Sequence, residues 1–148
     1  MNNILKFVLF ATTLTFIFSA CSQKKIDDKA HFVRGKETHE DLLPSEEKAL
    51  AELYLEIQVK MFEIIETENP EDGIAIINRL IDDAGGFGLS YGKASRSSKD
   101  KINTLIISGI ESYKGELNEL QSKLLSYYEN DKDFAECYDI FIKSFNLN

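Results

Sequence analysis

Residues 44–84 read PSEEKALAELYLEIQVKMFEIIETENPEDGIAIINRLIDDA. Apolar side chains recur every three or four positions along both halves of this stretch: Leu50, Leu53, Ile57, Met61 and Ile64, then Ile74, Ile77, Leu80, Ile81 and Ala84. That spacing places each set on one face of a helix. The stretch therefore predicts two amphipathic helices joined by a short turn.

Local signals mark the ends of these helices. Ser45, directly after Pro44, is the expected cap of the first helix. Asn69 is the expected cap of the second, with Pro70 at its first position. The Gly85–Gly86 pair is expected to end the second helix, because glycine favours helix termination.

Two further helices complete the expected fold. Apolar residues keep helical spacing from about Ser98 to Tyr127, although Gly109 and Gly115 lie within that span and each costs about 1 kcal/mol relative to alanine. Asp131 is the expected cap of a fourth helix. The side of this fourth helix that faces the core is expected to carry Phe134, Cys137, Tyr138, Phe141 and Phe145. The prediction is an all-α domain over residues 44–148, a four-helix bundle made of two helical hairpins.

The stretch 85–97, GGFGLSYGKASRS, is rich in glycine and serine and is predicted to be a loop. It combines aromatic and apolar side chains with cations in an otherwise acidic chain. The candidate partner-contact residues are Phe87, Leu89, Tyr91, Lys93 and Arg96. In the alternative interpretation, Phe87 or Leu89 closes the end of the bundle and the cations only offset acidic neighbours.

The first twenty residues have the three-part plan of an export signal. Met1 to Lys6 carry one positive charge, residues 7–18 are an apolar stretch, and two small residues precede Cys21. The apolar stretch is shorter than the ~20 residues that a membrane-spanning helix needs. We therefore expect residues 1–20 to be removed as a signal peptide.

The segment Phe18-Ser19-Ala20-Cys21 resembles the lipobox of bacterial lipoproteins, with Phe18 where the usual pattern has Leu. The resemblance covers residues 1–21 only. It implies that a diacylglyceryl group is attached to the Cys21 thiol, that the signal is cut before Cys21, and that acyl chains anchor the protein in the bacterial envelope. In that family, an Asp directly after the lipidated Cys tends to keep the protein in the inner membrane. This chain has Ser22 there, which resembles outer-membrane lipoproteins, and its pair Asp27–Asp28 resembles signals of surface lipoproteins.

Residues 21–43 are polar, include both histidines, and are interpreted as a lipidated flexible tether with a reach of roughly 25 Å. The whole chain has a formal net charge of −8. Such a charge argues against nucleic-acid binding, since phosphate backbones are repelled. It also argues against adhesion to anionic lipid other than through the anchor.

Catalytic and metal-binding patterns are not recognised in this sequence. The histidines, His31 and His39, lie in the tether, away from the predicted helices that could hold a nucleophile or a metal. Met61, the plausible haem ligand, is interpreted as a core residue. Cys137 is expected to be a buried, inert thiol. No enzyme activity, cofactor or metal is therefore expected.

These expectations leave three possible roles for the mature domain. The preferred one is a non-enzymatic module that binds a protein partner while anchored to the membrane through Cys21. A second is a structural or assembly factor of the envelope. The third is a carrier of a small apolar ligand or a metal in the bundle core.

Overall fold

The computed structural model describes residues 39–145. The predicted signal peptide, Cys21 and most of the predicted tether lie outside the described residues. Within them the helices follow in the order α2 (Pro44–Met61), η1 (Phe62–Glu66), α3 (Pro70–Lys93), α4 (Arg96–Ile110), η2 (Glu111–Tyr113), α5 (Lys114–Asn130) and α6 (Lys132–Ser144), where η marks a 3-10 helix. The prediction of an all-α helical bundle is confirmed.

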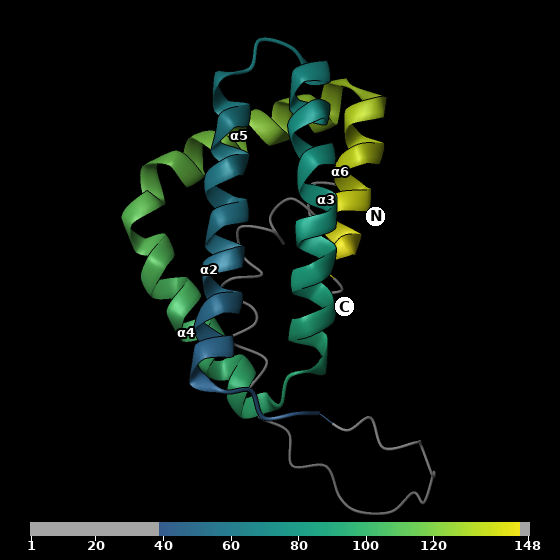
Figure 1. Cartoon of the computed structure of the whole chain (residues 1–148). Coiled ribbons are helices and arrows are strands. Elements are labelled where there is room, and N and C mark those ends of the chain that lie inside the picture. Colours follow the sequence, from purple (N-terminus) through teal and green to yellow (C-terminus); the bar gives the residue numbers. More distant parts are fainter. Residues whose placement is uncertain (1–38, 146–148) are drawn as a thin grey trace, which may run out of the picture. The chain divides into compact units, whose positions relative to one another are not determined.

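The helices are arranged around the antiparallel pair α2 and α3 (Figure 1). Helix α4 packs on α2 and runs parallel to it, since Glu47 lies beside Ser98 and Leu55 beside Gly109. Helix α6 packs on α3, also in parallel. Helix α5 crosses one end of the domain, where it contacts η1 and α6. The first predicted hairpin is therefore present. In the predicted second hairpin, only α5 contacts α6, because α4 packs on α2.

Aromatic rings form the centre of the core. A continuous series of ring contacts, with centroids 5.1–6.3 Å apart, connects the end of α5 with α6, α2 and α3. Its members are Tyr127, Phe134, Tyr138, Phe141, Phe145, Tyr54, Phe87 and Tyr91. All but the half-buried Tyr91 are buried. Large rings in contact contribute both buried area and specific edge-to-face geometry, so this series defines how α6 packs on α2 and α3.

Helix α3 does not end at Gly85–Gly86 as predicted but continues to Lys93. The reason is tertiary packing. A Cβ on Gly88 would lie 2.6 Å from the backbone of Phe145, so a glycine is needed where the end of α6 approaches α3. Phe87 packs into the core on the same turn. Burial of this last part of α3 outweighs the low helix propensity of its glycines.

The predicted third helix is divided in two by η2. Gly109 lies just before the division, and a Cβ there would clash with Cδ1 of Leu55. This glycine therefore allows α4 to approach α2 closely. After η2 the chain turns into α5 and crosses the end of the domain (Figure 1).

The predicted helix caps are mostly correct. Asn69 accepts a hydrogen bond from the backbone N–H of Asp72, and Asp131 accepts one from Phe134. Ser45 is not the cap of the first helix, because α2 already begins at Pro44. The carboxylate of Glu46 instead accepts a hydrogen bond from the backbone N–H of Leu43, at 2.7 Å.

Candidate functional site

The predicted contact residues lie on a helix and on its junction with α4, not in a loop. Phe87 is 1% exposed and belongs to the core, so its assignment to a contact surface is wrong and its place is the one given by the alternative interpretation. Leu89, by contrast, is 60% exposed. Lys93 and Arg96 are exposed on either side of the α3–α4 junction. Tyr91 is half-buried.

Tyr91 is held in place by three neighbours. Its ring stacks on Phe87 with centroids 5.3 Å apart, and its hydroxyl donates a hydrogen bond to Oδ1 of Asn103. The ammonium group of Lys99 lies 5.5 Å from the ring centroid on its face, a cation–π contact. Tyr91 therefore connects α3 to α4 rather than forming a free contact residue.

The chain enters the domain beside these residues. Glu40 pairs with the α3–α4 junction as an isolated parallel bridge, since its N–H donates to the carbonyl of Lys93 and its carbonyl accepts from the N–H of Ser95. The hydroxyl of Ser95 also donates to the carboxylate of Asp41, at 2.5 Å. Residues 39–43, predicted to be the last part of the tether, are therefore part of the folded unit.

A buried polar cluster fixes the next residues of the chain. Ser98, 1% exposed, accepts a hydrogen bond from the backbone N–H of Leu42 and donates one to Oε1 of Glu47. The Glu47 carboxylate, on a residue only 4% exposed, also pairs with Nζ of Lys101 at 3.1 Å. A buried carboxylate needs such partners because leaving it unpaired is costly. In the sequence, Ser98 marks only the expected start of a helix, and neither Ser98 nor Glu47 indicates this cluster.

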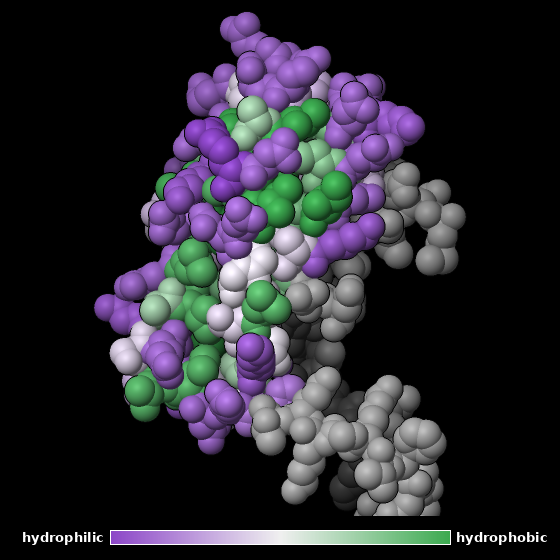
Figure 2. Space-filling model, turned by 45° about the vertical axis from the view of Figure 1, so that its right-hand side comes forward, coloured by the Kyte–Doolittle hydropathy of each residue, from purple (hydrophilic) through white to green (hydrophobic). Residues whose placement is uncertain are grey.

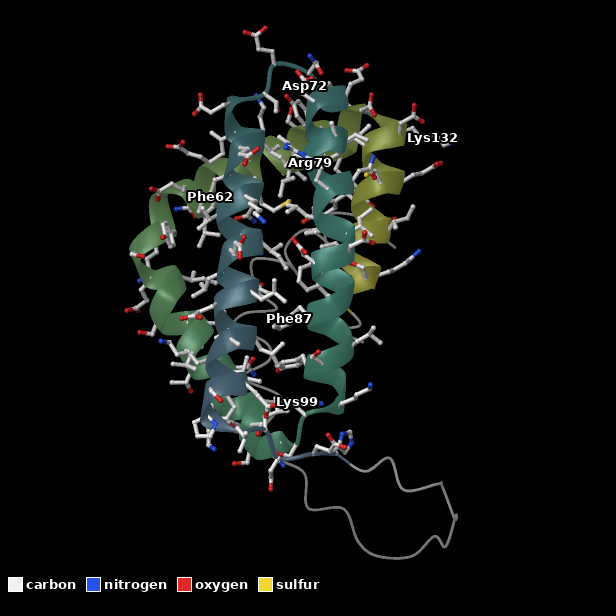
Figure 3. The ribbon with its side chains drawn as sticks, in the orientation of Figure 1. Phe62, Asp72, Arg79, Phe87, Lys99 and Lys132 are labelled. Carbon is white, nitrogen blue, oxygen red and sulfur yellow. The ribbon has the colours of Figure 1, made fainter. Side chains whose placement is uncertain are left out.

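We call the end of the domain formed by residues 39–48 and 89–101 the base, and the end formed by residues 66–72 and 129–136 the apex. Figure 3 labels Lys99 at the base and Asp72 at the apex. The base holds five acidic and five basic side chains, whereas the apex holds eight acidic side chains and one basic one. Negative charge is therefore concentrated away from the point where the chain enters.

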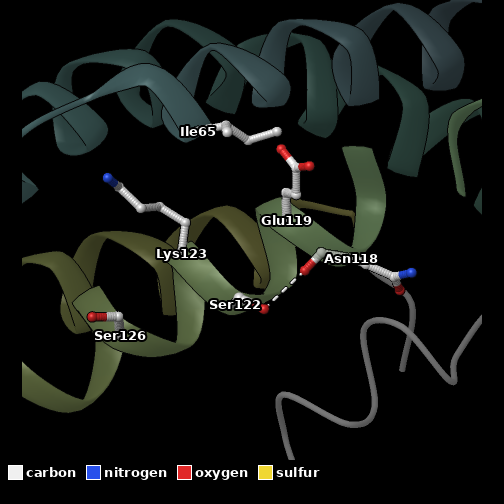
Figure 4. Close-up of a pocket in the computed structure, with 6 residues that line it drawn as sticks. All are labelled: Ile65, Asn118, Glu119, Ser122, Lys123 and Ser126. Atoms are coloured by element: carbon white, nitrogen blue, oxygen red, sulfur yellow. Dashed lines mark hydrogen bonds between the residues drawn. The ribbon is translucent and has the colours of Figure 1, made fainter. Parts of the chain in front are cut away.

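The surface of the described residues includes two depressions. The larger, about 560 Å³, lies between η1 and α5 and is wide open (Figure 4). Its lining residues are Ile65, Asn118, Glu119, Ser122, Lys123 and Ser126. The smaller, about 180 Å³, lies between η1 and α3 and includes Lys60 and Arg79. Most of the residues that line them are polar or charged, and neither is an enclosed apolar cavity.

Cys137 is half-buried rather than buried as predicted. Its thiol lies 3.4 Å from Oδ1 of Asn78, and partial burial raises the pKa of the thiol. Between residues 39 and 145, no group of three or more His, Cys, Asp or Glu side chains is arranged to hold a metal ion. Within the same range, no helix is long and apolar enough to cross a membrane.

Comparison with known proteins gives no relative for this chain: no family model, curated protein or solved structure matches it.

Proposed function

We propose that this protein is a lipid-anchored, non-enzymatic module of the bacterial cell envelope that binds a protein partner. The anchor would be attached to Cys21, and the outer membrane is the favoured location. The observation that carries the proposal is the order of features along the chain. An apolar stretch and Phe18-Ser19-Ala20-Cys21 precede a polar run, which leads to a helical domain that receives the chain at one end.

The fixed point of attachment supports a tethered module. Hydrogen bonds from Glu40 and Leu42 hold the chain against the base, so the chain joins the domain at that end and not on the flanks or at the apex. Exposed apolar side chains occur on the flanks, by which we mean the described residues between the base and the apex. Ile140 on α6 is 55% exposed and Val59 on α2 is 44% exposed. In Figure 2, apolar patches on the side formed by α3 and α6 are interrupted by polar side chains, a mixture typical of non-obligate protein interfaces.

The anchoring half of the proposal is tested by intact-mass spectrometry of the protein purified from its own membranes. The expected product begins at Cys21 and carries the mass of a diacylglyceryl group with or without a further acyl chain. Cys21→Ser should leave the protein unmodified and release it from the membrane fraction. A chain that is cut elsewhere, or that is uncut and carries no lipid, would contradict the proposal.

The binding half is tested by photo-crosslinking in cells. A crosslinking residue is placed at Glu68 on the apex, Ile140 on a flank, or Leu89 at the base. One protein crosslinked from the apex or flank, which in purified form binds the mature domain with a measurable Kd, is the expected result. Purified candidates that fail to bind would favour the structural or assembly role. Release of a bound small molecule on denaturation would favour the carrier role.

A further inference from the structure

We propose that the base of the domain, with Leu43, Leu89, Lys93 and Arg96, lies against the bilayer surface in which the anchor is embedded. This inference rests on the proposed lipid anchor and adds to it the orientation of the domain. It also assigns a role to the exposed residues of the sequence-predicted contact region. These residues would meet lipid headgroups, and the protein partner would be met elsewhere.

The connection between Cys21 and the folded domain is short, and it joins the domain at the base. Seventeen residues separate Cys21 from His39. A flexible chain of that length would have a root-mean-square reach of roughly 20–25 Å, which is smaller than the ~27 Å length of an 18-residue helix such as α2. Because Glu40 is fixed to the α3–α4 junction, this short connection starts at the base. The base is therefore the end of the domain that the anchor keeps near the membrane.

The base also carries exposed apolar side chains. Among the large apolar side chains of residues 39–145, Leu43 and Leu89 are the two most exposed, at 63% and 60%. Both lie at the base, Leu43 directly before α2 and Leu89 near the end of α3. Insertion of such side chains at the headgroup boundary removes apolar area from water. Two leucines alone give weak binding, so the contact depends on the anchor.

The distribution of charge also distinguishes the base from the rest of the domain. The base is electrically balanced, with five acidic and five basic side chains, whereas the remaining described residues carry seventeen acidic and six basic ones. An anionic bilayer therefore repels the flanks and the apex but not the base. Within the described part of the chain, neither Lys93 nor Arg96 forms an ion pair, so both are available to lipid phosphates. Repulsion of the acidic remainder and attraction of these cations favour the same orientation.

The chain contains no tryptophan, so a single introduced tryptophan reports on one position. The lipidated protein is reconstituted in vesicles that contain phosphatidylglycerol and a lipid brominated near the headgroup end of its acyl chains. Base variants are Leu43→Trp and Leu89→Trp, and the matched controls are Ile140→Trp, with similar native exposure, and Glu68→Trp at the apex. Circular dichroism verifies the fold of each variant. At least twofold stronger quenching at the two base positions than at the controls is expected.

Charge is tested on the Leu89→Trp background. K93E with R96E is expected to lower quenching about twofold in phosphatidylglycerol vesicles, and to have little effect in vesicles of phosphatidylcholine alone. Added salt should reduce the difference between the two lipids, because exposed charges are screened. Equal quenching of the charge variant and its parent would overturn the role of Lys93 and Arg96.

Failure of the inference is distinguishable from failure of the proposed function. Cys21 without lipid in the mass spectrum overturns the anchor and this inference with it. A lipidated chain that floats with vesicles, but whose base tryptophans are quenched no more than those at positions 68 and 140, overturns the orientation alone. In that case, crosslinking of Leu89 to a protein would identify the base as a protein-binding surface.

Discussion

The hydroxyl of Ser98 donates a hydrogen bond to Oε1 of Glu47 across 2.9 Å, although the two residues are 51 positions apart. The same hydroxyl oxygen accepts the backbone N–H of Leu42. One buried side chain thus joins the start of α4, the first turn of α2 and the segment through which the chain enters the domain. This single hydroxyl therefore links the packing of α4 on α2 to the position at which the chain enters the domain.

Ser98→Ala is expected to lower the free energy of unfolding by about 1–3 kcal/mol, the usual cost of leaving a buried polar group without its partner. Urea denaturation followed by circular dichroism measures the change. Ser97→Ala, at an exposed neighbouring position, is the control and should change stability by less than about 0.5 kcal/mol. Faster hydrogen exchange at the Leu42 amide should accompany the loss. Unchanged exchange there would contradict the coupling.

Two glycines on α3 are expected to respond to the same substitution with opposite signs. Gly88→Ala places a methyl group 2.6 Å from the backbone of Phe145, and the resulting displacement of α6 should destabilise the domain by about 1–3 kcal/mol. Gly86→Ala meets nothing within 4 Å and should stabilise it by about 0.5–1 kcal/mol through higher helix propensity. Thermal unfolding measures both. A loss of stability in Gly86→Ala would mean that α3 does end near residue 85.

The glycines also show how far sequence patterns determine this fold. The Asn69 and Asp131 caps were predictable because each acts on residues only three positions away. Gly85 and Gly88 look alike in sequence, yet only Gly88 faces the backbone of another helix. That distinction depends on where α6 packs, which is not encoded near residue 88. The close approach of Gly109 to Leu55 on α2 is also a contact between residues far apart in the sequence, and nothing near residue 109 indicates it.

The base could be predicted only in part. Leu89, Lys93 and Arg96 stood out by composition, and the structure exposes all three. Phe87 belongs to the same group of aromatic, apolar and cationic residues but is buried. Such a composition does not show which aromatic ring packs into the core. The cluster around Glu47 gave no signal. Ser98 and Glu47 are residue types that are common at the start of a helix. Their hydrogen bond is apparent only when α2 and α4 are seen packed together.

Alkaline pH is expected to destabilise the domain through its buried tyrosines. Burial raises the pKa of the Tyr54 hydroxyl far above its ordinary value of 10.0, with a smaller contribution from Tyr91, and burial raises that of Tyr138 likewise. Above about pH 10 the unfolded chain loses these protons and the folded chain keeps them. Stability should therefore be unaffected by these groups below that pH. Above it, stability should fall by about 1.4 kcal/mol per pH unit for each group.

Urea denaturation between pH 8 and about pH 11 measures this dependence. The double variant Tyr54→Phe with Tyr138→Phe keeps both rings in the core and removes both hydroxyls. It should show a shallower fall above about pH 10 than the parent chain. The same slope in both proteins would show that other groups cause the alkaline loss.

Cys137 is expected to react slowly with alkylating reagents while the domain is folded. Partial burial raises the pKa of its thiol, so the reactive thiolate is less populated than in an exposed cysteine at the same pH, and the contact with Asn78 further limits access. In a mature chain carrying Cys21→Ser, Cys137 is the single thiol, and iodoacetamide labelling followed by mass spectrometry gives its rate directly. The rate in native buffer should be lower than the rate in urea at each pH from about 7 to about 9, and the two should approach one another as the pH rises. Equal rates at about pH 7 would show that α6 opens from α3 readily. The parallel packing of these two helices, which depends on Gly88 and Phe145, would then be a transient state of the domain.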